Sequence, residues 1–108
     1  MANEITAVVV QPNGDVEKIV FDGSLQKMQE IVGGYIEGVF NPDYVAYVNE
    51  EGLIRGLPYN EAATDFISRG FIYRLHLVGP VVIVGAGDSE GNDTSVHQST
   101  LDYYQLEN

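Results

Sequence analysis

Cysteine is absent from this sequence of 108 residues, and so is tryptophan. Without thiols the chain cannot form disulfide bonds, thiolate metal sites or cysteine nucleophiles. The sequence also lacks any uninterrupted apolar segment near the roughly 20 residues that a membrane-spanning helix needs. Its first residues, MANEITAVVV, lack the basic region of a secretion signal. We therefore expect a soluble, cytoplasmic protein with no membrane partner.

Positive charge is scarce, because 5 Lys and Arg residues face 16 Asp and Glu residues and the formal net charge is -11 at pH 7. So anionic a chain repels phosphate backbones, and we expect no direct binding to nucleic acid. The acidity has two interpretations. It keeps a small protein soluble, or its carboxylates imitate a phosphate array and occupy the nucleic-acid groove of another protein.

Length and composition predict one globular domain over residues 1–108, since 44% of the residues are hydrophobic. We expect the core to span 4–85, followed by an acidic loop and a C-terminal tail over 86–108.

Turn residues and periodicity predict the first half of the fold. The dipeptide Asn-Gly separates two runs rich in β-branched residues, 4–10 and 16–21, which is typical of an antiparallel hairpin. Apolar residues at helical spacing follow at 25–32, where Asp22 or Ser24 can cap the first turn. Gly33 then ends the helix, because glycine tolerates the left-handed conformation.

The middle of the chain predicts a second hairpin. Extended runs at 35–40 and 43–49 meet at Asn-Pro-Asp. The following NEEG has the residue types of a reversal, so the second hairpin is predicted over 44–56. We expect Gly52 to supply a positive φ there and LIRG, 53–56, to form a short return strand.

A second helix is predicted over 61–69, with Asn60 as its cap and an ion pair between Asp65 and Arg69, four residues apart. The continuous apolar run at 80–84 is typical of a central strand that is covered on both faces.

These elements give an α+β fold in the order ββαβββαβ: a mainly antiparallel sheet of about five strands with two short helices packed on it. A short C-terminal helical turn, capped by Ser99, completes the chain. Helices on one face of the sheet would leave the other face for a partner or a second copy, which allows a homodimer.

Candidate chemistry concentrates after the last strand. Asp88, Glu90, Asn92 and Asp93 resemble half of a calcium loop, but Ser99 stands where the bidentate glutamate belongs. A solvated acidic loop therefore explains them, and we expect no metal site.

Ser95, His97 and Asp102 supply the atoms of a catalytic triad, although a triad is recognised by geometry rather than by sequence proximity. His76 lies in an apolar run, which favours a partly buried histidine over a general base. No nucleophile–base pair stands out, so we expect a non-enzymatic protein with no catalytic residues and no cofactor.

Three stretches carry a family resemblance: GGYIEGV at 33–39, VNEEGLIRGLPYNEAAT at 48–64 and GPVVIVG at 79–85. With them the chain resembles domain-of-unknown-function family 3846, small bacterial and bacteriophage proteins that share an N-E-E-G-x-x-x-G-L-P-x-N motif. The resemblance runs from the first hairpin to Gly85. It implies a phage or prophage context and brings no catalytic role with it.

Two functions fit these observations. The first is a small acidic binding protein of phage type that modulates a host protein, such as a defence or nucleic-acid-handling factor. The alternative is a small-molecule or nucleotide-signal binding module, a sponge, with a pocket at the Asn49–Asn60 hairpin and the helix N-terminus that follows it. The residues predicted to bind the partner or ligand are Asn49, Glu50, Glu51, Arg55, Asn60, Glu61 and Asp65.

Overall fold

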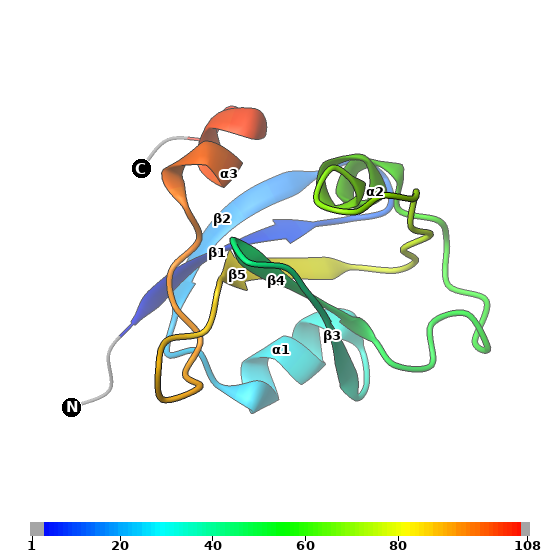
Figure 1. Ribbon diagram of the computed structural model, residues 1–108. Helices are drawn as coiled ribbons and strands as arrows, with labels where there is room; N and C mark the ends of the chain where they lie inside the picture. The colour runs from blue at the N-terminus through cyan, green and yellow to red at the C-terminus, as the bar shows by residue number, and fades with distance from the viewer. Residues whose placement is uncertain (1–3, 107–108) are drawn as a thin grey trace.

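The computed structural model describes residues 4–106, which form a five-stranded sheet with three helices (Figure 1). The strand order is β2-β1-β5-β4-β3, and all neighbouring strands are antiparallel. The α+β class and the antiparallel sheet are therefore confirmed. The elements are β1 (Ile5–Val10), β2 (Val16–Phe21), α1 (Leu25–Val32), β3 (Ile36–Phe40), β4 (Tyr44–Asn49), α2 (Glu61–Ser68), β5 (Val81–Gly85) and α3 (Gln98–Tyr103).

Local signals placed the first elements correctly. Gly14 has a φ of 95° in the turn between β1 and β2, which is the positive φ that a tight reversal requires. At α1, the side chain of Ser24 accepts a hydrogen bond from the amide of Lys27, and Gly33 ends the helix in the left-handed conformation. These contacts confirm Ser24 as the cap of α1 and Gly33 as its end.

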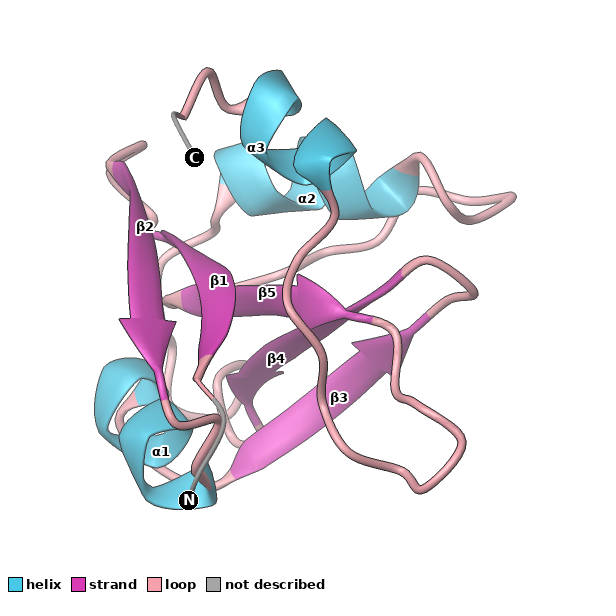
Figure 2. Cartoon of the chain, turned by 90° about the vertical axis from the view of Figure 1, so that its left-hand side faces the viewer, coloured by secondary structure: helices cyan, strands magenta, loops and turns pink. Residues whose placement is uncertain are grey.

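Helices cover both faces of the sheet, and the expectation that they lie on one face is wrong. Figures 1 and 2 show α1 on one side of the sheet and α2 with α3 on the other. The central strands β1, β5 and β4 carry apolar residues at successive positions, so each of their faces needs a cover. The core of the α2 face includes Val8, Val10, Ala46, Ile67, Ile83 and Leu101, and the core of the α1 face includes Ala7, Val9, Met28, Val32, Val45, Val82 and Val84. A bare face is therefore not available as the basis for a dimer.

The predicted strand at 53–56 does not form. Consecutive turns occupy this stretch, in which the amide of Arg55 donates to the carbonyl of Glu51 and the amide of Leu57 donates to the carbonyl of Gly52. A return strand would have to pair with β4, but both edges of β4 are already taken, by β3 and β5. The element order is therefore ββαββαβα.

Gly52 has a different role from the one expected. The left-handed conformation in this loop belongs to Gly56, with a φ of 70°, whereas Gly52 lies against Val78. A Cβ added at Gly52 would come within 2.8 Å of the Val78 side chain, so close packing requires this glycine.

The segment after Gly85 belongs to the core, whereas the sequence predicts a core that ends at Gly85. Val96 and Leu101 are buried in the α2 face, and the amide of Val96 donates to the carbonyl of Thr6 on β1. Helix α3 begins at Gln98 with His97 at its N-cap, so Ser99 is not the cap. Within residues 4–106, no helix is long and apolar enough to cross a membrane.

Candidate functional site

The seven predicted site residues do not line one common pocket. Two of them are buried asparagines with structural hydrogen bonds, and the other five are charged residues on the surface or at its margin.

Asn60 is fully buried and ties three segments together. Its Nδ2 donates to the carbonyl of Val10 at 2.9 Å and to the carbonyl of Gly79 at 2.8 Å, while its Oδ1 accepts from the amide of Ala63 at 3.0 Å. Both amide hydrogens are therefore used inside the protein. Asn60 is the N-cap of α2, as predicted. Its side chain also links β1 and the segment before β5 to this helix by hydrogen bonds.

Asn49 and Arg55 attach the loop 50–56 to the end of α1. Asn49 is 4% exposed, and its Nδ2 donates to the carbonyl of Val32 while its Oδ1 accepts from the amide of Glu51. Arg55 donates from Nη1 to the carbonyl of Gly33 at 3.0 Å. Carbonyls at a helix C-terminus lack intrahelical partners and carry partial negative charge, so both contacts suit this end of α1.

Glu61 and Asp65 lie on α2, apart from the loop 50–56. Glu61 is exposed in the first turn, where the helix dipole favours a carboxylate. The predicted ion pair of Asp65 with Arg69 is wrong, because Asp65 pairs with Arg74, and Arg69 lies 5.1 Å from the ring centre of Tyr103 instead. The chain returns past α2 after residue 70 and brings Arg74 to Asp65, which spacing along one helix does not reveal.

A groove of about 320 Å³ lies at the edge of the sheet that β3 forms. Its floor comes from β3 and β4, and its walls come from the loop 50–56 and the segment 76–78. The lining residues are Glu37, Val39, Val48, Asn49, Glu50, Leu53, Ile54, His76, Leu77 and Val78. Of the predicted site residues, only Asn49 and Glu50 belong to it.

The rim of the groove combines apolar and acidic side chains. Leu53 is 70% exposed and Ile54 is 88% exposed. The exposed side chains of Glu37 and Glu50 line the same groove, and the exposed Glu51 follows Glu50 in the loop. Exposed apolar side chains beside a hollow often mark a binding surface. Sequence reasoning missed Leu53 and Ile54, because it placed them in a strand, and it missed Glu37 on β3.

His76 closes one side of the groove and is exposed, whereas the sequence predicted partial burial. Its ring stacks on Tyr59 with the centroids 4.6 Å apart, and the Tyr59 hydroxyl accepts a hydrogen bond from Arg74. An isolated bridge between Tyr59 and Val78 holds the two segments side by side. The segment 76–78, which forms this wall of the groove, is therefore held in place by its contacts with Tyr59.

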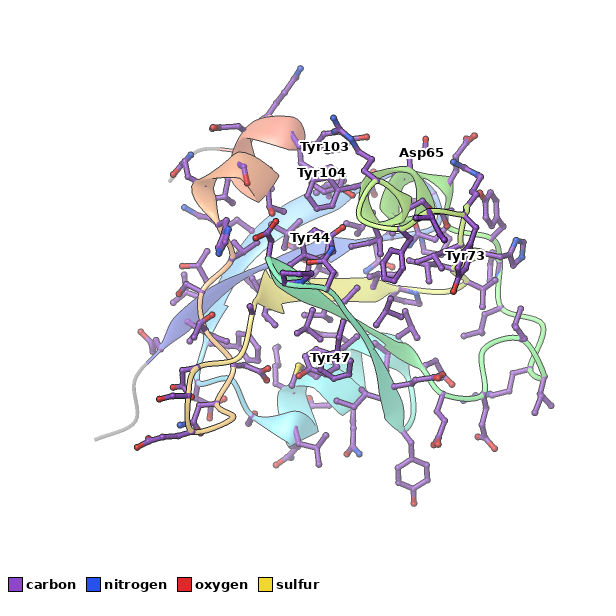
Figure 3. All side chains as sticks on the ribbon, viewed as in Figure 1. Tyr44, Tyr47, Asp65, Tyr73, Tyr103 and Tyr104 are labelled. Atoms are coloured by element: carbon purple, nitrogen blue, oxygen red, sulfur yellow. The ribbon has the colours of Figure 1, made fainter. Side chains whose placement is uncertain are left out.

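The acidic loop 86–97 uses its carboxylates to hold its own shape. Asp88 accepts hydrogen bonds from the amides of Asn92 and Glu90, and these bonds hold the pKa of Asp88 below its usual value. Asp93 accepts a bond from the hydroxyl of Tyr47, which lies on the α1 side of the sheet in Figure 3. Within residues 4–106, no three His, Cys, Asp or Glu side chains lie close enough together to hold a metal ion.

A family model described as a domain of unknown function, DUF3846, matches residues 5–107. The chain belongs to this family. The match extends beyond Gly85, where the sequence resemblance ended, and includes the segment that contributes Val96 and Leu101 to the core. No curated protein matches the chain, and no solved structure matches it. The DUF3846 match therefore establishes the family of the chain and assigns no activity to it.

Proposed function

We propose that this member of the DUF3846 family is a non-enzymatic binding protein of phage type that modulates a host protein in the cytoplasm. The target class we favour is a defence or nucleic-acid-handling factor, because such factors carry cationic surfaces that attract an acidic protein. The observation that carries the proposal is the pair of exposed apolar side chains, Leu53 and Ile54, at the rim of the groove.

The exposed apolar side chains at the rim of the groove explain why a partner would bind at this place. Leu53 and Ile54 are consecutive and expose most of their surface to water, on a loop fixed by Asn49 and Arg55. Burying such side chains against a partner releases about 25 cal/mol for each Å² of apolar area. A loop that is already fixed also loses little conformational entropy when it binds.

The carboxylates near the groove explain why the partner is expected to be basic. Glu37, Glu50 and Glu51 stand near the groove in a chain of net charge -11, and Arg55 is directed at the carbonyl of Gly33. Complementary charge of this kind raises association rates and selects partners more than it adds affinity. We therefore expect the partner to present cations around an apolar anchor.

A photo-crosslinking amino acid at position 54 tests the proposal in cells of the natural host. The matched control is the same amino acid at Val20, an apolar residue on β2 that is 56% exposed. We expect a defined protein adduct from position 54 that is absent from position 20. The adduct should be lost when Leu53→Ser is added, with the melting temperature unchanged. Equal adducts from both positions would refute a specific surface at the groove.

The acidic residues are tested as two separate pairs. In Glu50→Gln/Glu51→Gln the carboxylates beside the groove are lost, and in Glu61→Gln/Asp65→Asn those on α2 are lost. We expect the first pair to weaken capture of the crosslinked partner and to reduce the salt sensitivity of that capture. If only the second pair does so, the binding surface lies on α2 and the groove is not part of it.

The volume of the groove favours a second candidate function, a small-molecule binding module. About 320 Å³ lies at the lower end of the range for ligand pockets, and most of the lining is apolar. Glu37, Glu50 and His76 favour an apolar ligand with a cationic or hydrogen-bond-donating group over a nucleotide phosphate. Native mass spectrometry of protein purified from the natural host tests this candidate, and a bound ligand lost in Val48→Trp would support it.

A further inference from the structure

We propose that the free edge of β3 receives an extended, basic segment of the partner as a sixth strand of the sheet, with an apolar side chain of that segment in the groove. This inference rests on the proposed binding function and specifies how the partner is recognised. Strand addition obtains affinity from main-chain hydrogen bonds and specificity from alternate side chains.

The hydrogen-bond register shows which backbone groups of β3 point outward. At the two ends of the β3–β4 ladder, the amide of Glu50 donates to the carbonyl of Tyr35, and the amide of Asn41 donates to the carbonyl of Tyr44. In an antiparallel pair, alternate residues bond to the same neighbour. Between Tyr35 and Asn41, the backbone groups of Glu37 and Val39 therefore also point toward β4. The N–H and C=O groups that point away from β4 belong to Ile36, Gly38 and Phe40.

These outward groups have no partner within residues 4–106. Strand β3 pairs only with β4, and no loop, cap or side-chain hydrogen bond involves the outward groups. Gly38 lies at the centre of this edge and has no side chain, so an approaching backbone meets little obstruction there. The ring of Phe40 folds back over Gly38 on the face of the sheet rather than across its edge.

The opposite edge of the sheet differs in a way that favours β3. Strand β2 carries Glu17 and Lys18 at successive positions, and charged residues, lysine above all, are a common protection of edge strands against pairing. Strand β3 has Glu37 as its single charge and lies next to an apolar groove. The two edges of one sheet are therefore not equivalent as docking sites.

The groove lies on the side of the sheet that an added strand can reach. Glu37 and Val39 alternate with the outward residues, so their side chains share one face of β3 and both line the groove. A strand added about 4.8 Å from β3 would run along this rim. Its alternate side chains would point toward Leu53 and Ile54, and the side chains between them would point to the other face.

Charge complementarity identifies the occupant as a basic segment. Glu37 and Glu50 line the groove and Glu51 follows directly in the loop, whereas Arg55 already bonds to the carbonyl of Gly33. A segment with one Val or Ile between two Lys or Arg at alternate positions matches this surface, because side chains at alternate positions share a face. The apolar side chain enters the groove, and the flanking cations reach Glu37 and Glu50. An acidic strand of the same shape would be repelled.

The main-chain bonds are tested with a short capped peptide in which one Val or Ile stands between two Lys or Arg at alternate positions, so that all three side chains face the groove. Binding of the fluorescent peptide to the full chain is measured by anisotropy, beside the same peptide N-methylated at every residue. N-methylation removes the donors and keeps the side chains and the charge. We expect a loss of affinity of about tenfold or more. Equal affinity of the two peptides, or no binding at about 1 mM, overturns strand addition.

The location is tested by amide hydrogen exchange of the ¹⁵N-labelled protein. We expect the peptide to slow exchange at Ile36, Gly38 and Phe40, whose amides face outward, and to change little at Glu37 and Val39, whose amides face β4. Slow exchange at the outward amides before any peptide is added, together with a dimer mass, would show that a second copy occupies the edge and would overturn the proposal.

The charges are tested in Glu37→Gln/Glu50→Gln, with Glu17→Gln/Glu30→Gln as the matched control at exposed positions on β2 and α1. We expect the first variant alone to weaken peptide binding and lower its salt dependence. Equal weakening in both variants overturns the basic-strand specificity. A specific adduct from position 54 combined with insensitivity to N-methylation would leave the binding function standing and remove only the strand mode.

Discussion

The hydroxyl of Tyr47 donates a 2.7 Å hydrogen bond to the carboxylate of Asp93, so a residue of β4 fastens the acidic loop to the α1 face of the sheet. Burial raises the pKa of Tyr47, and the bond to Asp93 raises it further, because only the protonated phenol can donate.

This bond predicts how stability changes at alkaline pH. An unfolded tyrosine titrates near pH 10, and the folded pKa of Tyr47 lies higher, so its contribution is complete below about pH 10 and is lost as the pH rises through the folded pKa. In Tyr47→Phe we expect stability at pH 7 to fall by about 1 kcal/mol. We also expect its further decline above pH 10 to be shallower than in the original chain, as measured by urea unfolding.

Tyr73→Phe is the control for this prediction, because Tyr73 is 64% exposed and has no hydrogen bond from its hydroxyl within residues 4–106. Burial also raises the pKa of Tyr44 and of Tyr104, so part of the alkaline decline should remain in Tyr47→Phe. An unchanged decline in that variant would contradict the role given to Tyr47.

The buried amide of Asn60 is expected to matter more for stability than any exposed asparagine. Asn60→Ala leaves the carbonyls of Val10 and Gly79 and the amide of Ala63 without their partner, and we expect a loss of about 3 kcal/mol in urea unfolding. Asn92→Ala, at an exposed loop position, should cost less than about 0.5 kcal/mol. A loss below about 1 kcal/mol in Asn60→Ala would mean that water replaces the amide.

Substitutions at two nearby glycines, Gly85 and Gly87, test whether close packing at Gly85 contributes to stability. A Cβ on Gly85 would collide with the backbone carbonyl of Ser95 and with the side chain of Thr94, whereas a Cβ on Gly87 meets nothing closer than 3.7 Å. We expect Gly85→Ala to destabilise the protein by about 2 kcal/mol and Gly87→Ala to change stability by less than about 0.5 kcal/mol. Thermal unfolding of the two variants checks this difference, and equal melting temperatures would contradict it.

The contribution of the C-terminal segment to the core is tested with two leucines. Leu101 on α3 is 5% exposed and packs on the α2 face, while Leu25 on α1 is 55% exposed. We expect Leu101→Ala to cost about 3 kcal/mol because it leaves a cavity. Leu25→Ala removes the same atoms from a surface position and should cost less than about 1 kcal/mol. Similar losses in urea unfolding would show that α3 is not part of the core.

Sequence reasoning succeeded where a local contact decides the structure. The Gly14 turn, the Ser24 cap and the Asn60 cap each depend on neighbours within a few residues, so the residue types were sufficient. It failed at 53–56, because a strand exists only if an edge is free to pair with it, and β5 had already taken that edge of β4. Asp65 was assigned Arg69 instead of Arg74 because helical spacing shows only neighbours on the same helix, whereas Arg74 reaches Asp65 by the return of the chain past α2.

The groove was only partly predictable for a related reason. The stretches that carry the family resemblance include Glu37, Asn49 and Glu50, but they did not show that Glu37 lies beside the other two, and His76 comes from a segment outside them. The two asparagines of the motif, Asn49 and Asn60, stabilise the fold, since their side-chain amides bond to backbone groups of other elements. Motif membership alone does not separate a structural asparagine from a ligand-facing one.

The central position of β5 has a consequence for synthesis on the ribosome. Each of the two hairpins, β1–β2 and β3–β4, is made of neighbouring segments and can form as soon as it leaves the exit tunnel, but only β5 connects them in the sheet. The pairs that join the halves, such as Val8 with Ile83, link distant parts of the chain, which makes folding slow. The nascent protein should therefore remain two unconnected hairpins until β5 has left the exit tunnel and paired with both β1 and β4.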